Sequence, residues 1–184
     1  MNIIIPDKIM RIETQRLVLR EIYRDDDKEI FEIFSDDEVA LYDWFRPIKN
    51  LSEADTFIER YNEEFEAGEE ITWGIALKET EKLIGICCLG NFDNYARRAE
   101  IGYDLMKSQW GRGYGTEAVK AVITYGFKNM NLNRIEAFIT PGNTASIRLM
   151  EKSGFIKEGI VRERDFIKGK FEDGVIMSKL RRDE

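Results

Sequence analysis

The chain has 184 residues, of which 43% are hydrophobic and 34% charged, a composition typical of one folded domain. It contains no histidine, which excludes Ser-His-Asp and Cys-His hydrolases and zinc sites built on histidine. The formal net charge of −7 disfavours nucleic acid as a partner, and no apolar run approaches the roughly 20 residues of a membrane helix.

Hydrophobic periodicity predicts one strand and then two helices in the first third of the chain. Residues 16–22 alternate like a half-buried strand, and 25–35 place apolar residues at helical spacing after an acidic start. Residues 52–68 open with a Ser-x-x-Asp capping signature at Ser52 and end at Gly68, as expected of a second helix. We interpret the acidic clusters of this region as solvated helix faces, although they would also attract a cationic substrate.

Three strands are expected next. Residues 72–92 form two strands around a polar turn, and 98–106 form a third. The adjacent Cys87 and Cys88 point to opposite faces of a strand, so we interpret them as small buried side chains in a reducing cytosol. Gly102 interrupts the third strand, where a glycine often marks a bulge or a close approach of the backbone.

The remaining segments predict two helices, a strand and a closing hairpin: a helix over 116–130, a strand over 133–140, a helix over 145–155, and a hairpin with its turn at 168–170. Consecutive strands favour an antiparallel meander, and the strand–helix–strand unit at 98–140 favours one parallel pair. The sequence therefore predicts a single α/β (α+β) domain over residues 1–184, with helices on the faces of a mixed sheet.

The segment WGRGYG at 110–115 places three glycines between the third of these strands and the next helix. Small residues there allow the free N–H groups of a helix N-terminus to surround an anion, which the helix dipole also favours. The Gly-Thr-Glu that follows does not match an ATP-binding phosphate loop, and the Gly-x-Gly-x-Gly spacing misses the dinucleotide fingerprint by one residue. The glycines alone are equally compatible with a plain turn.

The order of the segments resembles the GNAT superfamily of acetyl-CoA-dependent N-acetyltransferases, and within it the RimJ/RimL-like branch of ribosomal-protein N-terminal acetyltransferases. The similarity rests on TQRLVLREI near the start, AEIGYDL, WGRGYGTEA, LNRIEAFITPGNTASIRLMEKSGF and FIKGKFED. The resemblance implies the GNAT fold: a mostly antiparallel sheet of six to seven strands, about four flanking helices and a V-shaped cleft between the central strands. It also implies acetyl-CoA as cosubstrate and no metal.

The resemblance further implies two sets of backbone groups that bind the coenzyme. The CoA pyrophosphate is expected on the N–H groups of Gly111, Arg112, Gly113, Tyr114, Gly115 and Thr116. The pantetheine arm is expected to pair with Tyr103, Asp104 and Leu105, where an N–H near Leu105 would polarise the thioester carbonyl. Asn143 matches a family asparagine that contacts the pantetheine region, and on local physics alone it is a helix cap.

By the same resemblance, a neutral amine attacks the acetyl thioester directly. The tyrosine that serves many GNAT enzymes as acid falls on Met150, so this role does not carry over. The serine proposed as the acid in the RimL-like branch corresponds to Ser146. The base implied by that branch corresponds to Asp165, with Glu100 ranked beside it and Glu136 below both.

The predicted function is transfer of acetyl to a primary amine, with a protein N-terminal α-amine indicated by the branch. A polyamine, an amino acid or an aminoglycoside is the alternative acceptor, and a non-catalytic CoA-binding sensor is the alternative class of protein. Tyr42, Trp44 and Phe45, within the acceptor segment 24–68, either line the pocket or serve as core or lid aromatics. The expected location is cytoplasmic, as a monomer or homodimer, with no nucleic-acid or membrane partner.

Overall fold

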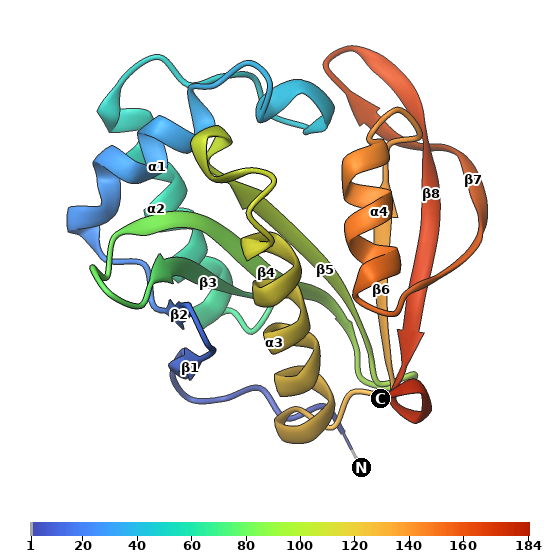
Figure 1. The fold of residues 1–184 in the computed structure, drawn as a ribbon. Coiled ribbons are helices and arrows are strands. Elements are labelled where there is room, and N and C mark those ends of the chain that lie inside the picture. The colour runs from blue at the N-terminus through green and yellow to red at the C-terminus, as the bar shows by residue number, and fades with distance from the viewer. Residues whose placement is uncertain (1) are drawn as a thin grey trace.

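The computed structural model describes residues 2–184 and contains the predicted helices and strands in the predicted order (Figure 1). The strands are β1 (Ile12–Glu13), β2 (Leu17–Arg20), β3 (Glu70–Leu77), β4 (Leu83–Asp93), β5 (Arg98–Leu105), β6 (Arg134–Ile139), β7 (Ile156–Ile167) and β8 (Lys170–Leu180). The helices are α1 (Asp27–Phe34), α2 (Leu51–Glu66), α3 (Tyr114–Asn129) and α4 (Thr144–Lys152), with short 3₁₀ turns between elements.

All eight strands belong to one sheet in the order β1-β2-β3-β4-β5-β6-β8-β7. Only β5 and β6 pair in parallel, and every other neighbour is antiparallel, which confirms the mixed, mostly antiparallel sheet. The sheet has one strand more than the upper end of the predicted range. β1 is the addition, because a pair of residues is too short to leave a periodic signal in the sequence.

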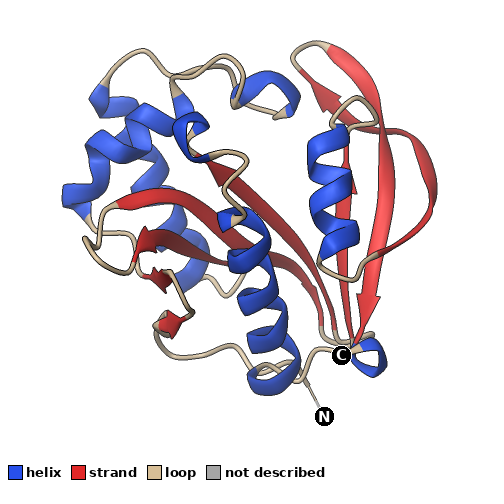
Figure 2. Cartoon of the chain, in the orientation of Figure 1, coloured by secondary structure: helices blue, strands red, loops and turns tan. Residues whose placement is uncertain are grey.

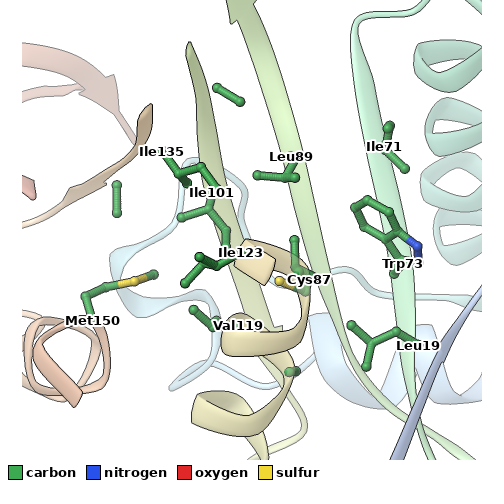
Figure 3. Close-up of a cluster of buried hydrophobic side chains, with 14 of the residues drawn as sticks. Leu19, Ile71, Trp73, Cys87, Leu89, Ile101, Val119, Ile123, Ile135 and Met150 are labelled. Carbon is green, nitrogen blue, oxygen red and sulfur yellow. The ribbon is translucent and has the colours of Figure 1, made fainter. Parts of the chain in front are cut away.

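The helices cover the two faces of the sheet (Figure 2). One buried cluster joins α3 and the start of α4 to one face, with Trp73 and Cys87 among its members (Figure 3). A second buried cluster joins α1 and α2 to the other face, where Ile86 points. Neighbouring residues Ile86 and Cys87 therefore serve opposite faces, as strand alternation requires.

Two local expectations are wrong. Helix α2 is capped by Asn50, whose side chain accepts a hydrogen bond from the Glu53 N–H at 3.2 Å, and not by Ser52. The β4–β5 register runs regularly through Gly102, and the irregularity lies between Gly90 and Asp93 of β4 instead. Gly102 is small for a packing reason, because a Cβ there would lie 3.1 Å from the sulfur of Cys88.

Within residues 2–184, no helix combines the length and the apolar character needed to cross a membrane.

Candidate active site

The two central strands of the sheet diverge and open a cleft. β5 and β6 pair only at their first residues, from Arg98 with Arg134 to Glu100 with Glu136. Beyond that point a cavity of about 1060 Å³ lies between them. Its walls are the α1–α2 loop, the end of β5, the glycine loop at 110–115, the end of β6 and α4. The predicted V-shaped cleft is therefore present.

The glycine loop offers a row of free backbone donors at one end of this cleft. Gly113 is the N-cap of α3, with φ at +81° and no side-chain cap. Across the described chain, no backbone or side-chain group accepts a hydrogen bond from the N–H groups of residues 111–116. Six unpaired donors at the positive end of a 16-residue helix fit the pyrophosphate of CoA.

Two side chains hold the loop in place. The indole N–H of Trp110 donates to the Leu105 carbonyl at 2.8 Å, which ties the loop to the end of β5. Arg16, at the start of β2, donates to the Arg112 carbonyl at 2.9 Å and lies over the Tyr114 ring at 4.6 Å. The segment TQRLVLREI contains Arg16, but no pattern in the sequence predicts its contact with the glycine loop. The Arg112 side chain does not line the cleft.

The N–H group of Leu105 faces the cleft. The N–H of Met106 donates to the Ile84 carbonyl of β4 at 2.8 Å, and backbone groups of successive strand residues alternate in direction. Leu105 therefore points its N–H away from β4, toward the open edge of β5. This orientation fits the predicted donor to a thioester oxygen.

Residues of α4 meet β5 across the cleft. Asn143 accepts a hydrogen bond from the Ser146 N–H at 3.1 Å, so it is the cap of α4. Burial raises the pKa of Tyr103, and the neighbouring Ser146 hydroxyl opposes that rise. Both side chains line the cleft, and Met150, which is 2% exposed, belongs to the core and also borders the cleft.

The three carboxylates considered as bases are all held by arginine. Arg164 binds Glu100 at 3.0 Å and Asp165 at 2.7 Å. Neither of these carboxylates is among the residues that line the cleft. Glu136 is 5% exposed and contacts Arg98 at 2.6 Å and Arg134 at 2.5 Å. The structure thus brings Glu100 and Asp165 together on one guanidinium, outside the cavity.

Charge is divided along the cleft. Three cationic side chains line it: Arg148 and Lys152 on α4, and Arg60 on α2, whose guanidinium lies 3.5 Å from the Glu64 carboxylate. Carboxylates line the opposite side, from the α1–α2 region, β3 and β5: Glu38, Asp43, Glu64, Glu70 and Asp104. The arrangement separates a region suited to an anionic coenzyme from one suited to a cationic substrate.

Aromatic side chains complete the acidic side. Tyr42, Trp44 and Phe45 all line the cleft, and Phe45 is also buried in the second core cluster. The guanidinium of Arg60 lies 4.8 Å from the ring centroid of Trp44. Cys88 also faces this cavity, whereas Cys87 is buried in the core, and both are free thiols.

A mixed sheet whose central strands separate beside a helix N-terminus with free N–H groups defines an acyl-CoA-dependent transferase. A profile described as Acetyltransferase (GNAT) domain matches residues 16–156, and the chain belongs to this family. It is therefore an acetyl-CoA-dependent N-acetyltransferase, which removes the sensor-module alternative.

Similar proteins agree with this assignment. The chain is 39% identical over 170 residues to the uncharacterized N-acetyltransferase p20 of Bacillus licheniformis, covering 92% of this chain and 96% of that protein. It is 26% identical over 176 residues to the ribosomal protein uS5-alanine N-acetyltransferase of Escherichia coli, covering 91% and 89%. A GNAT-family acetyltransferase crystal structure from Bacillus anthracis matches with a TM-score of 0.83 at 27% identity, covering 94% and 99%.

Proposed function

We propose that this N-acetyltransferase acetylates the α-amine of a protein N-terminus. The main observation in favour of an amine acceptor is that carboxylates line one side of the cleft. A primary amine is a cation at neutral pH, and these carboxylates would attract it. The α-amine is supported by the similarity to an Escherichia coli relative named for the alanine of ribosomal protein uS5.

The described residues fit the coenzyme and divide its binding between two elements. The N–H groups of residues 111–116 would hold the pyrophosphate, and the end of β5 would pair with the pantetheine arm. Acetyl-CoA supplies an activated acetyl thioester. The Leu105 N–H would stabilise negative charge on its carbonyl oxygen, and Ser146 would donate a proton to the departing sulfur.

A small polyamine is the second candidate acceptor. Five carboxylates around one cavity would suit several ammonium groups on one molecule better than a single α-amine.

An acceptor screen tests both candidates. Free CoA thiol would be measured with acetyl-CoA and either peptides of varied N-terminal residue or spermidine, spermine, free amino acids and an aminoglycoside. We expect turnover with peptides and a dependence on the first residue. Turnover with polyamines alone would overturn the N-terminal proposal, and turnover with no amine would overturn both candidates.

Other predictions accompany this proposal. Residues 1–184 act as one domain, as a monomer or homodimer, in the cytoplasm, where two free thiols and acetyl-CoA are compatible. Among residues 2–184, no group of three or more acidic or cysteine side chains is placed to hold a metal.

A further inference from the structure

Two aspartates from opposite walls of the cleft meet at its acidic side. Asp104 lies on β5, two residues after Gly102, which pairs with Cys88 of β4. Strand alternation therefore directs the Asp104 side chain to the same face of the sheet as Cys88, and both residues line the cavity. Asp43 follows the short turn Ala40–Tyr42 in the α1–α2 loop. The two carboxyl groups are within hydrogen-bond reach of each other, and both residues line the cavity.

No cation neutralises this pair. Within the described chain, neither aspartate has a lysine or arginine nitrogen within 4.0 Å, and apart from Asp43 no donor reaches the Asp104 carboxyl group. The nearest cation, Lys168, attracts Asp43, but its ammonium donates to the carbonyls of Ala40 and Leu41.

The two aspartates differ in this respect from the carboxylates buried elsewhere. Asp26, which is 8% exposed, is bound by Arg20 through two hydrogen bonds of 2.8 and 2.9 Å. Glu136 is bound by two arginines. Because a desolvated carboxylate without a partner is costly, a pair left unneutralised in the substrate cleft is suited to a cationic ligand.

We propose that the Asp43–Asp104 pair binds the ammonium group of the acceptor and that Asp104 takes its proton before attack. The proposal rests on the proposed amine acetylation. Asp104 is assigned the proton because it adjoins Leu105, whose N–H faces the thioester position. Asp43 is the positioning residue, which holds the second carboxyl group against Asp104.

The proton balance of the step is simple. One ammonium proton passes to the Asp104 carboxylate, and the freed lone pair forms the bond to the acetyl carbon as the carbon–sulfur bond breaks. Ser146 donates its hydroxyl proton to the departing thiolate, and the second proton leaves the nitrogen and restores the Ser146 hydroxyl. The products are the acetylated amine and CoA thiol, and Asp104 returns its proton to water.

The environment of the pair increases the proton affinity of the Asp104 carboxylate, as a proton acceptor requires. Burial raises the pKa of Asp104 well above its usual range, and repulsion and hydrogen bonding from Asp43 raise it further. Lys168 of the β7–β8 turn attracts Asp43. The other titratable and charged groups that line the cavity from α2, β3, β4 and β5 are Arg60, Tyr61, Glu64, Glu70, Cys88 and Tyr103. A general base is most effective when its pKa lies near the working pH.

The test compares the steady-state kinetics and pH profiles of Asp104→Asn, Asp43→Asn and wild type on an amine that the wild type acetylates. We expect Asp104→Asn to lower kcat by about 100-fold or more, the usual contribution of a general base, with CoA affinity within about twofold of wild type.

In Asp43→Asn, loss of the second carboxyl group lowers the pKa of Asp104, so the acidic limb of kcat/KM moves to lower pH. Asp93→Asn, an exposed turn carboxylate bound by the Tyr95 and Ala96 N–H groups, is the matched control and keeps wild-type kinetics.

The outcomes separate the two proposals. Wild-type kinetics in Asp104→Asn, or the large loss appearing in Glu100→Gln or Asp165→Asn instead, overturns this inference and leaves the amine acetylation standing. A wild type that acetylates no amine overturns the proposed function and this inference with it. If Asp104→Asn does not fold, a ¹³C-NMR titration of the aspartate carboxyl carbons is the alternative test. The proposal requires Asp104 to titrate at lower pH in Asp43→Asn than in wild type. An unchanged titration overturns the proposal.

Discussion

At the scale of single residues, Gly113 shows why the glycine loop needs its composition. Its φ of +81° is a conformation that costs a branched residue about 1–3 kcal/mol, and a Cβ there would lie 3.4 Å from the Arg16 guanidinium. We expect Gly113→Val to weaken CoA binding by at least about tenfold, measured by calorimetry, because the side chain enters the row of free N–H groups.

The control for this variant has the same backbone strain elsewhere. Gly68 follows the end of α2 with φ at +70°, and a Cβ added there would have no other atom within 4 Å. Gly68→Val should lose comparable stability and keep its CoA affinity. Equal affinities in the two variants would show that the loop does not hold the pyrophosphate.

The indole of Trp110 links the glycine loop to β5. Removing the hydrogen bond to the Leu105 carbonyl leaves that carbonyl without its donor, and one such bond contributes about 0.5–1.5 kcal/mol. We expect Trp110→Phe to raise the CoA dissociation constant about two- to tenfold. Trp44→Phe, on the acidic side of the cleft, should leave that constant unchanged.

The sequence indicates a candidate coenzyme loop but not the acidic pair, for a physical reason. The glycine loop is contiguous and its chemistry lies in the backbone, so glycine spacing, the following helix and the resemblance of the flanking segments together point to it. Asp43 and Asp104 meet only through the fold, and the loop that carries Asp43 has no periodicity to place it. Glu100 and Asp165 lie far apart in the sequence, which does not show that Arg164 binds both of them.

At the scale of elements, hydrogen bonds from Lys168 link the β7–β8 turn to the α1–α2 loop. The ammonium of Lys168 donates to the carbonyls of Ala40 and Leu41, immediately before Asp43. We expect Lys168→Met to free this loop and to raise KM for the amine several-fold, without changing the affinity for CoA. Lys170→Met is the matched control, because Lys170 lies in the same hairpin and contacts only the surface carboxylate of Glu172 among acidic residues. A shift of KM in both variants, or in neither, would contradict the role of Lys168.

Periodicity predicts the order and type of the main elements but not their exact ends. The cap of α2 shows the limit, since Ser52 with Asp55 and Asn50 with Glu53 both match a capping signature in the sequence. The structure uses Asn50, whose side-chain amide also donates to Glu53 at 2.7 Å. Choosing between overlapping signatures depends on how the preceding loop packs, which local sequence does not encode.

At the scale of the whole molecule, the ionisable groups divide into those that stabilise the fold and those that oppose it. Glu158, bound by Arg134 and by the Ser178 hydroxyl, has its pKa lowered to about 2. A lowered pKa contributes stability that is present above the unfolded value near 4.5 and is lost as pH falls toward 2. Asp104 has a raised pKa, so the folded state binds its proton more tightly than the unfolded state, and ionisation at higher pH opposes folding.

This difference in sign predicts opposite effects of two amide substitutions on thermal stability. At pH 7, Asp104→Asn should raise the melting temperature, by about 2–4 °C for each kcal/mol of relieved desolvation, even as it removes activity. The gain should shrink as pH falls and disappear below the unfolded pKa of 3.8, where the carboxyl is protonated in both states. Glu158→Gln should instead lower the melting temperature at pH 7, with the deficit shrinking toward pH 2. Melting curves of both variants from about pH 2 to pH 8 provide the measurement. A lower melting temperature for Asp104→Asn at pH 7 would mean that its carboxylate has a stabilising partner in the free protein, and the cleft would then have no unneutralised charge with which to attract an amine.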